Sequence, residues 1–371
     1  MTAGRQPGAS RAPGNRKPTL RDVARLAGVS TSTASIVFSG RGPVSAATAE
    51  RVRAAAADLA YAGPDPLAAS LRQRRSGIVA VVIEDRIAHA IGDPFALTVI
   101  DGLARVLDEI PAGMLLLART PGDDTRLLGQ LAAAPCDAVV FALCGPGQDP
   151  AVDLLAARGI PMIGSGAPLD PRVTHLAIDE RAASAAATQH LVDLGHHRLA
   201  HITLPLSPTA LPRAIGPVDL DEPGYPEAIE RARGFLDVAP HGELIQTAPA
   251  GVESGAAAGR VLLDRPKAER PTGIVAQSDL LAAGVLLAAR DLGIEVPGQL
   301  SVVGFDGVSL PWLGTELTTI DQFGPLKGRT LGEMVAATLT GRPVHGHRHP
   351  ARLRIGATSG PAPMPEPGPT E

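Results

Sequence analysis

The sequence predicts an all-α head at the N-terminus, followed by an α/β body of two lobes, each built on a doubly wound parallel sheet. Apolar residues between positions 18 and 62 recur at helical spacing, with capping residues between the runs. From Gly77 onward, short apolar runs alternate with Ala- and Leu-rich helical stretches, the pattern of parallel βα units. The 371 residues exceed one ordinary domain, and a hydrophobic content of 44% is sufficient for packed cores.

The helical head begins with a cap at Thr19, and Asp22 three residues later approximates a capping box. Val23, Leu26 and Ala27 then make one apolar face. Gly28 is placed to end this first helix, because glycine tolerates a positive φ. Ser30 is expected to cap a second helix and Ser45 a third, which together predict a helix-turn-helix with a supporting helix.

The body is predicted from its repeating pattern. Strands are expected at residues 78–83, 113–118, 138–143, 161–164, 199–204, 273–276 and 300–305. Helical spacing is clearest at 95–109, 180–194 and 280–292. Two such blocks, with a crossover of the chain between them, predict two lobes and a cleft between them.

Composition shifts divide the chain into five parts. We expect a disordered arm at 1–17, the head at 18–63, a hinge at 64–76, the two-lobed domain at 77–355 and a disordered Pro-rich tail at 356–371. Residues 1–76 carry a net charge of +8 and the remainder −12, which is typical of a polyanion-binding head on an acidic body.

Other features restrict the function classes. No apolar run is long enough for a membrane span, and the basic N-terminus lacks the apolar core of a secretion signal, so we expect a cytoplasmic, nucleoid-associated protein without a membrane partner. Cys136 and Cys144 match no metal or redox spacing and are expected to be reduced thiols. The sequence contains no nucleotide fingerprint and no nucleophile elbow, so we expect neither a cofactor nor an enzyme.

Three stretches of sequence carry a family resemblance. These are P-T-L-R-D-V-A-R-L-A-G-V-S-T-S-T-A-S (18–35), V-S-A-A-T-A-E-R-V-R-A-A-A-A-D-L-A-Y (44–61) and D-P-L-A-A-S-L-R (65–72). They resemble the lactose-repressor (LacI/GalR) family. The resemblance extends through the body to about residue 355, where it is carried by H-L-V-D-L-G-H-H-R-L-A-H-I, R-A-R-G-F, S-D-L-L-A-A-G-V, G-I-E-V-P-G-Q-L-S-V-V-G-F-D and L-T-T-I-D-Q-F. The resemblance implies a periplasmic-binding-protein-like core and a homodimeric transcription regulator, more often a repressor than an activator.

The resemblance also implies a set of DNA contacts to a near-palindromic operator. Thr31 and Ser32 occupy the main specificity positions of the recognition helix, and Ile36 stands where most relatives have Arg, so an apolar contact is expected there. Phosphate contacts are expected from Arg21, Ser30, Thr33, Ser35 and Arg41, although Arg21 and Arg41 can equally be solvated surface charges. Thr19 is a further expected DNA contact.

The hinge segment is the second implied DNA contact. In the family, the segment that D-P-L-A-A-S-L-R resembles folds only on operator DNA. Ala68 would allow two hinge helices to approach closely, and Leu71 would insert as a wedge into the minor groove. A plain linker is the alternative.

The effector site is implied less specifically. Arg231 and Asp306 survive the match to the family's ligand contacts, and Ser278 and Phe95 are further candidates. Arg231 and Asp306 can instead be structural, and Asp279 is expected to cap its helix. The effector is a small polar metabolite, with a polyol, a sugar acid or a sugar derivative all open. Whether it induces or co-represses is open too.

Two alternative interpretations of the sequence are less well supported. A transporter's solute-binding protein would share the body fold, but it would need a signal peptide and would have no helix-turn-helix. His345, His347 and His349 alternate as they would on one face of a strand, but without accompanying carboxylates they favour a solvated edge over a metal site.

Overall fold

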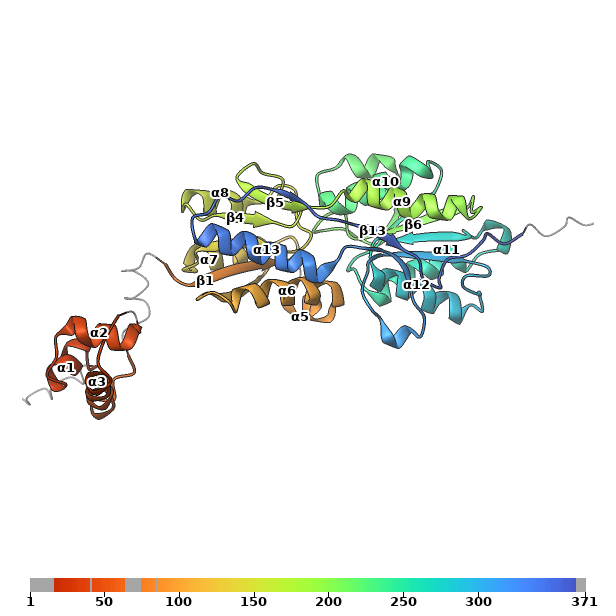
Figure 1. The fold of residues 1–371 in the computed structure, drawn as a ribbon. Coiled ribbons are helices and arrows are strands. Elements are labelled where there is room, and N and C mark those ends of the chain that lie inside the picture. The colour runs from red at the N-terminus through yellow and green to blue at the C-terminus, as the bar shows by residue number, and fades with distance from the viewer. Residues whose placement is uncertain (1–16, 41, 64–74, 85, 365–371) are drawn as a thin grey trace, which may run out of the picture. The chain divides into compact units, whose positions relative to one another are not determined.

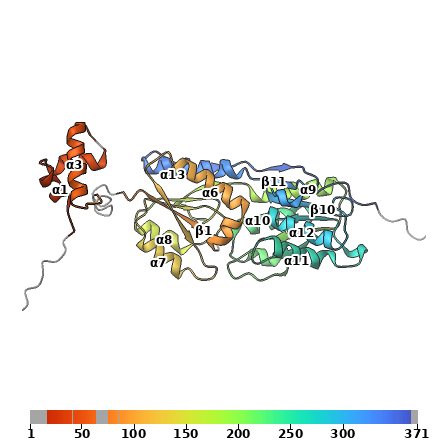
Figure 2. The ribbon, with the colours of Figure 1, turned by 90° about the horizontal axis from the view of Figure 1, so that it is seen from below.

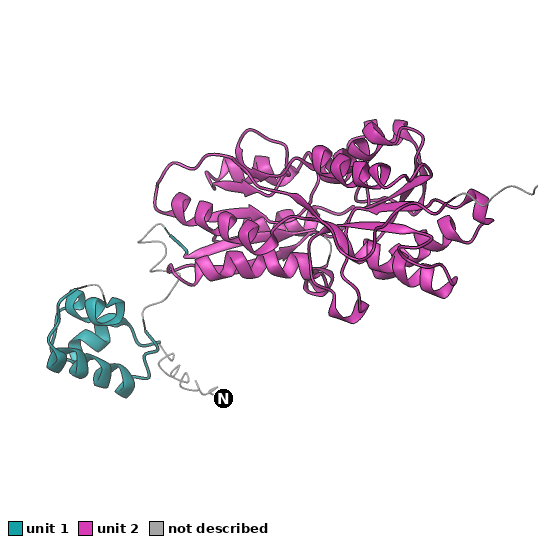
Figure 3. Cartoon of the chain, turned by 45° about the vertical axis from the view of Figure 1, so that its right-hand side comes forward, with its two compact units in different colours: residues 1–76 teal, residues 77–371 magenta. Residues whose placement is uncertain are grey.

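The computed structural model describes residues 17–40, 42–63, 75–84 and 86–364. The chain divides into two compact units, residues 1–76 and 77–371, which Figure 3 shows in separate colours. No helix among the described residues is long and apolar enough to cross a membrane.

The first unit contains three helices, α1 (Leu20–Leu26), α2 (Thr31–Ser39) and α3 (Ala46–Asp58). Hydroxyl side chains cap all three as the sequence predicts, and Gly28 between α1 and α2 has a φ of +65°. The core consists of small apolar side chains: Val23, Ala24, Ala27, Ala34, Val52, Ala55 and Ala56. The prediction that Leu26 faces this core is wrong, because its side chain is 54% exposed.

The first lobe of the second unit contains a six-stranded sheet in the order β12-β5-β4-β3-β1-β2, with every pair parallel. Its strands are β1 (Ile78–Ile83), β2 (Gly113–Ala118), β3 (Ala138–Phe141), β4 (Met162–Gly164), β5 (Val173–Ala177) and β12 (His347–Arg348). Val79, Val81 and Ile83 face one core, whereas Ala80 and Val82 face the other. Sheet and helices thus form three layers (Figures 1 and 2). The face with Val79 is covered by α5 (Ile87–Gly92), α6 (Pro94–Leu107) and α13 (Gly324–Leu339). The face with Ala80 is covered by α7 (Thr125–Ala133) and α8 (Pro150–Ala157).

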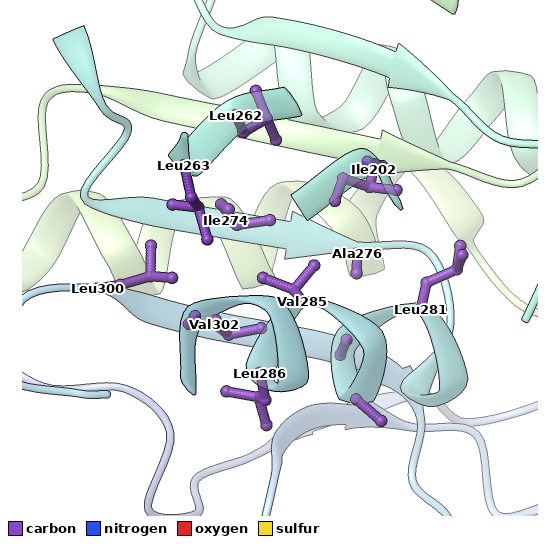
Figure 4. Close-up of a cluster of buried hydrophobic side chains, with 14 of the residues drawn as sticks. Ile202, Leu262, Leu263, Ile274, Ala276, Leu281, Val285, Leu286, Leu300 and Val302 are labelled. Atoms are coloured by element: carbon purple, nitrogen blue, oxygen red, sulfur yellow. The ribbon is translucent and has the colours of Figure 1, made fainter. Parts of the chain in front are cut away.

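The second lobe contains a seven-stranded sheet in the order β13-β11-β10-β9-β6-β8-β7, which is parallel except at its two edge strands. Its strands are β6 (Leu199–Thr203), β7 (Arg213–Ile215), β8 (Glu243–Gln246), β9 (Gly273–Ala276), β10 (Ser301–Asp306), β11 (Thr318–Asp321) and β13 (Arg352–Arg354). Helices α9 (Glu180–Asp193) and α10 (Pro226–Val238) cover one face, and α11 (Val252–Leu263) and α12 (Asp279–Asp291) the other. Figure 4 shows the core between the sheet and the helices α11 and α12, where Ile274 and Val302 from the sheet meet Leu262 and Val285 from the helices.

The chain passes between the lobes three times, after β5, after β11 and after β12. His349 ties these three connectors together. Its backbone N–H donates to Ala177 O at 2.9 Å, and its Nε2 lies 2.9 Å from Gln322 O, which can only accept. The three connections therefore meet at one buried histidine.

The prediction of a disordered tail from residue 356 is wrong for residues 356–364. Val302 N donates to Thr358 O at 2.8 Å, Thr358 Oγ1 donates to Val302 O at 2.7 Å, and Ala362 N donates to Leu194 O at 2.8 Å. Within 356–364 only Pro361 and Pro363 lack a backbone N–H, so the other residues can still bond to the second lobe. A proline-rich composition alone did not reveal this.

Candidate nucleic-acid interface and interlobe cavity

The start of α2 presents a cluster of hydroxyl groups. Ser30 Oγ accepts from Thr33 N at 3.0 Å and shares hydrogen bonds with Ser32 Oγ at 2.7 Å and Thr33 Oγ1 at 2.8 Å. Ser30, Thr31 and Ser32 are exposed, whereas Ala34 is fully buried and anchors the helix. The helix therefore offers its N-terminal turn, with unsatisfied backbone N–H groups, to a ligand such as a base edge or a phosphate.

The other predicted DNA contacts occupy varied places in the first unit. Arg21 is exposed on α1, and the Thr19 hydroxyl is engaged with Asp22 in the capping box. Ser35 and Ile36 are half-buried, and Ile36 covers Gly42, where a Cβ would lie 3.1 Å from Ile36 Cγ2. The predicted contacts at Arg41, Ala68 and Leu71 lie outside the described residues, as does most of the hinge.

A cavity of about 670 Å³ lies between the two lobes of the second unit, within the size range of small-molecule sites. It is reached from the carboxyl ends of β3 and β4, where ligands bind in open α/β sheets. In the cavity wall, Gly147 N of the first lobe donates to Gly224 O of the second lobe at 3.0 Å. Its lining comprises Gly147, Gln148, Ser165, Gly166, Leu169, residues 177–181 and 220–224, Pro226, Glu227, Ile229, Glu230, Arg233, Lys327 and Arg348.

Arg231 holds one wall of this cavity from behind. Its Nε donates to Glu180 Oε2 at 2.6 Å and its Nη1 donates to Gln277 O at 2.8 Å. The guanidinium also lies 3.8 Å from the centroid of the Phe305 ring, a stacked cation–π contact. Glu180 lines the cavity and Arg231 does not, so Arg231 fixes the position of a lining carboxylate.

Asp306 supports a second wall through a chain of hydrogen bonds. Gln322 Nε2 donates to Asp306 Oδ1 at 2.9 Å, and Lys327 Nζ donates to Gln322 Oε1 at 3.3 Å. Burial, followed by the neighbouring Asp279 carboxylate, raises the pKa of Asp306 well above its ordinary value. Phe95 lies beneath the same Lys327 ammonium, 5.6 Å from ring centroid to Nζ.

None of the four predicted effector contacts lines the interlobe cavity directly. Arg231, Asp306 and Phe95 act on lining residues, as described above, and Ser278 is the N-cap of α12, accepting from Leu281 N at 3.1 Å. The expectation that Asp279 caps this helix is therefore also wrong. Its carboxylate accepts from Val308 N and Thr319 Oγ1 instead.

Sequence reasoning missed the side chains that do line the cavity, above all Ser165, Glu180, Glu227 and Lys327. One available signal was the helical spacing of Glu227, one turn before Arg231 on α10. The others depend on how the two lobes meet, which local spacing does not report.

The described residues contain no group of three His, Cys, Asp or Glu side chains that could hold a metal ion. The three alternating histidines do not form a common strand face, because β12 comprises only His347–Arg348 and His349 is buried against the connectors.

Comparisons with known proteins agree with this geometry. Residues 19–63 match the family model described as bacterial regulatory proteins, lacI family, and residues 188–359 match the periplasmic binding protein-like domain. An HTH-type transcriptional regulator of Mycolicibacterium smegmatis is 33% identical over 335 residues, which cover 86% of this chain and 90% of that protein. The chain belongs to the LacI family of bacterial transcriptional regulators.

A second relative and two solved structures extend the comparison for this LacI-family chain. The regulator CelR of Thermobifida fusca is 32% identical over 88% of this chain and 93% of its own length. A CelR–cellobiose complex has a TM-score of 0.63 at 28% identity, covering 92% of this chain and 99% of that one. The Lac repressor dimer bound to operator, at 22% identity and a TM-score of 0.72 over 93% of this chain, shows the shared fold. The predicted family and fold class are confirmed, and the relatives named here are regulators, not enzymes.

Proposed function

We propose that this LacI-family regulator is a repressor that binds a near-palindromic operator as a homodimer, and that a small polar metabolite in the interlobe cavity controls its affinity for DNA. The observation that carries the proposal is the combination, in one chain, of an exposed hydroxyl-rich recognition helix with a cavity walled by both lobes. A symmetric dimer would present two copies of α2 to the two half-sites.

DNA recognition is assigned to the first turn of α2 and its surroundings. The exposed hydroxyls of Thr31 and Ser32 can bond to base edges, and the Ser30 and Thr33 pair lies beside free backbone N–H groups that suit phosphates. Arg21 adds a positive charge from α1. Ile36 offers only an apolar surface, which suits a thymine methyl group.

Control by an effector is assigned to the interlobe cavity. Because its wall includes Ser165 and Lys327 from elements of the first lobe and Glu227 from the second, a bound molecule would favour one relative position of the lobes. That difference in affinity between lobe arrangements is what couples ligand to DNA. The complex of a relative, CelR, with cellobiose supports a sugar or sugar derivative as the effector.

Selection from a random DNA library, followed by binding titrations at several salt concentrations, tests the DNA-binding half of the proposal. We expect a palindromic consensus, and Thr31→Ala or Ser32→Ala should change preference at defined bases. Arg21→Ala should weaken binding to all sequences and reduce the log–log salt slope by about 0.9. Arg290→Ala on α12 is the matched control, which removes one exposed arginine from the other unit. Failure to enrich any sequence would contradict the proposal.

Operator titrations with and without metabolites test the effector half. A metabolite that binds should change operator affinity by roughly 5- to 150-fold, the usual range of allosteric coupling. Release of DNA would identify an inducer and tighter binding a co-repressor. A metabolite that binds in the cavity without changing DNA affinity would contradict the regulatory assignment.

A further inference from the structure

Glu227 is a buried carboxyl group without a partner. It lies in the first turn of α10, is 4% exposed, and neither of its oxygens has a hydrogen-bond partner among the described residues. It faces the first lobe at Gly166, which has a φ of +98° and where a Cβ would lie 2.6 Å from Glu227 Oε1, so a larger residue there would displace the carboxyl group. A buried carboxyl without hydrogen bonds is costly, and such groups mark places where something else supplies the donors.

Other carboxyl groups on the cavity wall, unlike Glu227, have cationic partners. Glu180 accepts from Arg231, Glu230 from Arg233 at 2.8 Å, and Asp179 lies 3.3 Å from Arg348. The lining contains six carboxyl groups but only four basic side chains. Glu227 is the buried carboxyl of this lining that has no cationic partner, which favours a ligand that brings a positive charge to it.

Ser165 supplies a second unpartnered polar group at the same place. Its side chain is 3% exposed, and its Oγ has no hydrogen-bond partner within the part of the chain that the structure describes. It precedes Gly166, against which the Glu227 carboxyl packs, so the two groups come from opposite lobes to one corner of the cavity. The lining contains no aromatic side chain, so there is no platform for stacking a neutral sugar ring.

We propose that the effector carries a protonated amine, which donates hydrogen bonds to the Glu227 carboxylate and to Ser165 Oγ, and that it is a hydroxylated amine of amino-sugar size. This inference rests on the proposed effector function of the cavity. An ammonium group satisfies both oxygen partners with charge-assisted hydrogen bonds. Because the two partners belong to different lobes, the amine also joins the lobes.

The electrostatics of the site agree with an ammonium ligand. Burial, followed by the Glu180 carboxylate, raises the pKa of Glu227 to about 8, while Arg231 and Lys327 oppose the rise. Burial, followed by the Glu227 carboxylate, raises the pKa of the Cys144 thiol, so that this thiol stays neutral. Glu227 is therefore largely protonated at pH 6.5 on its own, and an ammonium ligand should displace that proton.

The test uses sugars that differ only at the amine. Glucose is compared with glucosamine, and cellobiose with its 2,2′-diamino counterpart and with the N,N′-diacetyl form of that counterpart, which has no charge. Binding to the full-length protein is measured by isothermal titration calorimetry at pH 6.5. We expect the amines to bind at least tenfold more tightly than the hydroxyl and acetamido forms, and to release up to one proton per site when buffers of different ionisation enthalpy are compared.

Two variants identify the group responsible. Glu227→Gln keeps the shape and removes the charge, and should abolish the preference for the amine. Glu243→Gln is the control, because it removes a paired carboxylate of the second lobe, bound to Arg265, that lies outside the cavity lining, and it should retain the preference within threefold. Should Glu227→Gln fail to fold, proton release by the unmodified protein still tests the inference: release on binding of an amine supports an ammonium–carboxylate contact, and no release contradicts it.

The results that would overturn the inference differ from those that would overturn the proposed function. Equal or tighter binding of the neutral sugars, no binding of any amine, or an amine preference that survives Glu227→Gln would refute the amine assignment. If a neutral sugar then changed operator affinity, the effector function would stand without it. If the amines bound through Glu227 but left operator affinity unchanged, the amine site would stand and the regulatory role would fail.

Discussion

Arg231→Ala should destabilise the second unit, because the structure gives this arginine a structural role behind the cavity. Its side chain is 3% exposed and is bonded to Glu180 and to the carbonyl of Gln277. Truncation removes both donors together and leaves the partly buried Glu180 carboxylate without its partner. The Phe305 ring also loses the guanidinium stacked on it.

The expected magnitude follows from these contacts. Removing one partner of a buried ion pair costs about 3–5 kcal/mol, and this value already includes the stranded partner. At roughly 2 °C per kcal/mol for a large domain, Tm should fall by about 6–10 °C. The control is Arg260→Ala, which breaks a pair with Asp291 whose side chains are both about half exposed. That surface pair should contribute no more than about 1 kcal/mol.

Urea unfolding of the full-length protein measures the effect. Trp312 is the single tryptophan of the chain and lies in the second unit, so its fluorescence reports the unfolding of that unit. Far-UV circular dichroism provides the second signal. If Arg231→Ala were as stable as the unmodified protein or more stable, the ion pair would contribute nothing to folding, and Arg231 would be better explained as a ligand contact.

Three other substitutions test separate parts of the structure. Ser30→Ala removes the α2 cap and should destabilise the head by about 1 kcal/mol, seen as faster hydrogen exchange of the α2 amides; unchanged exchange would contradict the cap. Gly234→Ala places a Cβ against the carbonyl oxygen of Arg181 and should lower the free energy of unfolding by more than about 2 kcal/mol. Gly129→Ala is the control, because a Cβ there meets nothing within 4 Å and should not lower the urea midpoint. Equal midpoints for the two variants would show that α9 and α10 can move apart to accept the extra methyl group. Glu227 has its pKa raised from 4.5 to about 8, so the folded state holds a proton that the unfolded chain loses, and stability is lost as pH rises through that window. Glu227→Gln should therefore gain stability relative to the unmodified protein between pH 5 and 8, by at most about 5 kcal/mol, and a pH-independent difference would contradict this.

Local patterns predicted the parts of the fold that local chemistry determines. The strands β1, β2 and β9 begin and end at the predicted residues, because apolar runs of these lengths are bounded by glycine or polar residues. The three helix caps of the head followed from Ser and Thr at the right spacing. The short strand β7 was missed, since three residues (Arg-Ala-Ile) carry no readable periodicity, whereas the edge strand expected around the alternating histidines is present only as the two residues of β12.

The cavity was harder to predict, because its chemistry depends on residues that are distant in the sequence. Arg231 was expected to face the ligand, but Glu180, 51 residues earlier, pairs with it instead. Glu227 became a candidate only when its lack of partners and its position against Gly166 were known. Leu26 shows the converse case, in which the helical period was right but none of the described helices of the head covers that face.

Because the polypeptide returns to the first lobe after building most of the second, neither lobe is a continuous stretch of sequence. A protease that cut one of the three connectors would leave two intact, so a nicked molecule should stay assembled under native conditions. His349 bonds to Ala177 O at the end of β5 and to Gln322 O just after β11, so the third crossing is hydrogen-bonded where the other two begin. A change in the relative position of the lobes therefore has to bend all three crossings together.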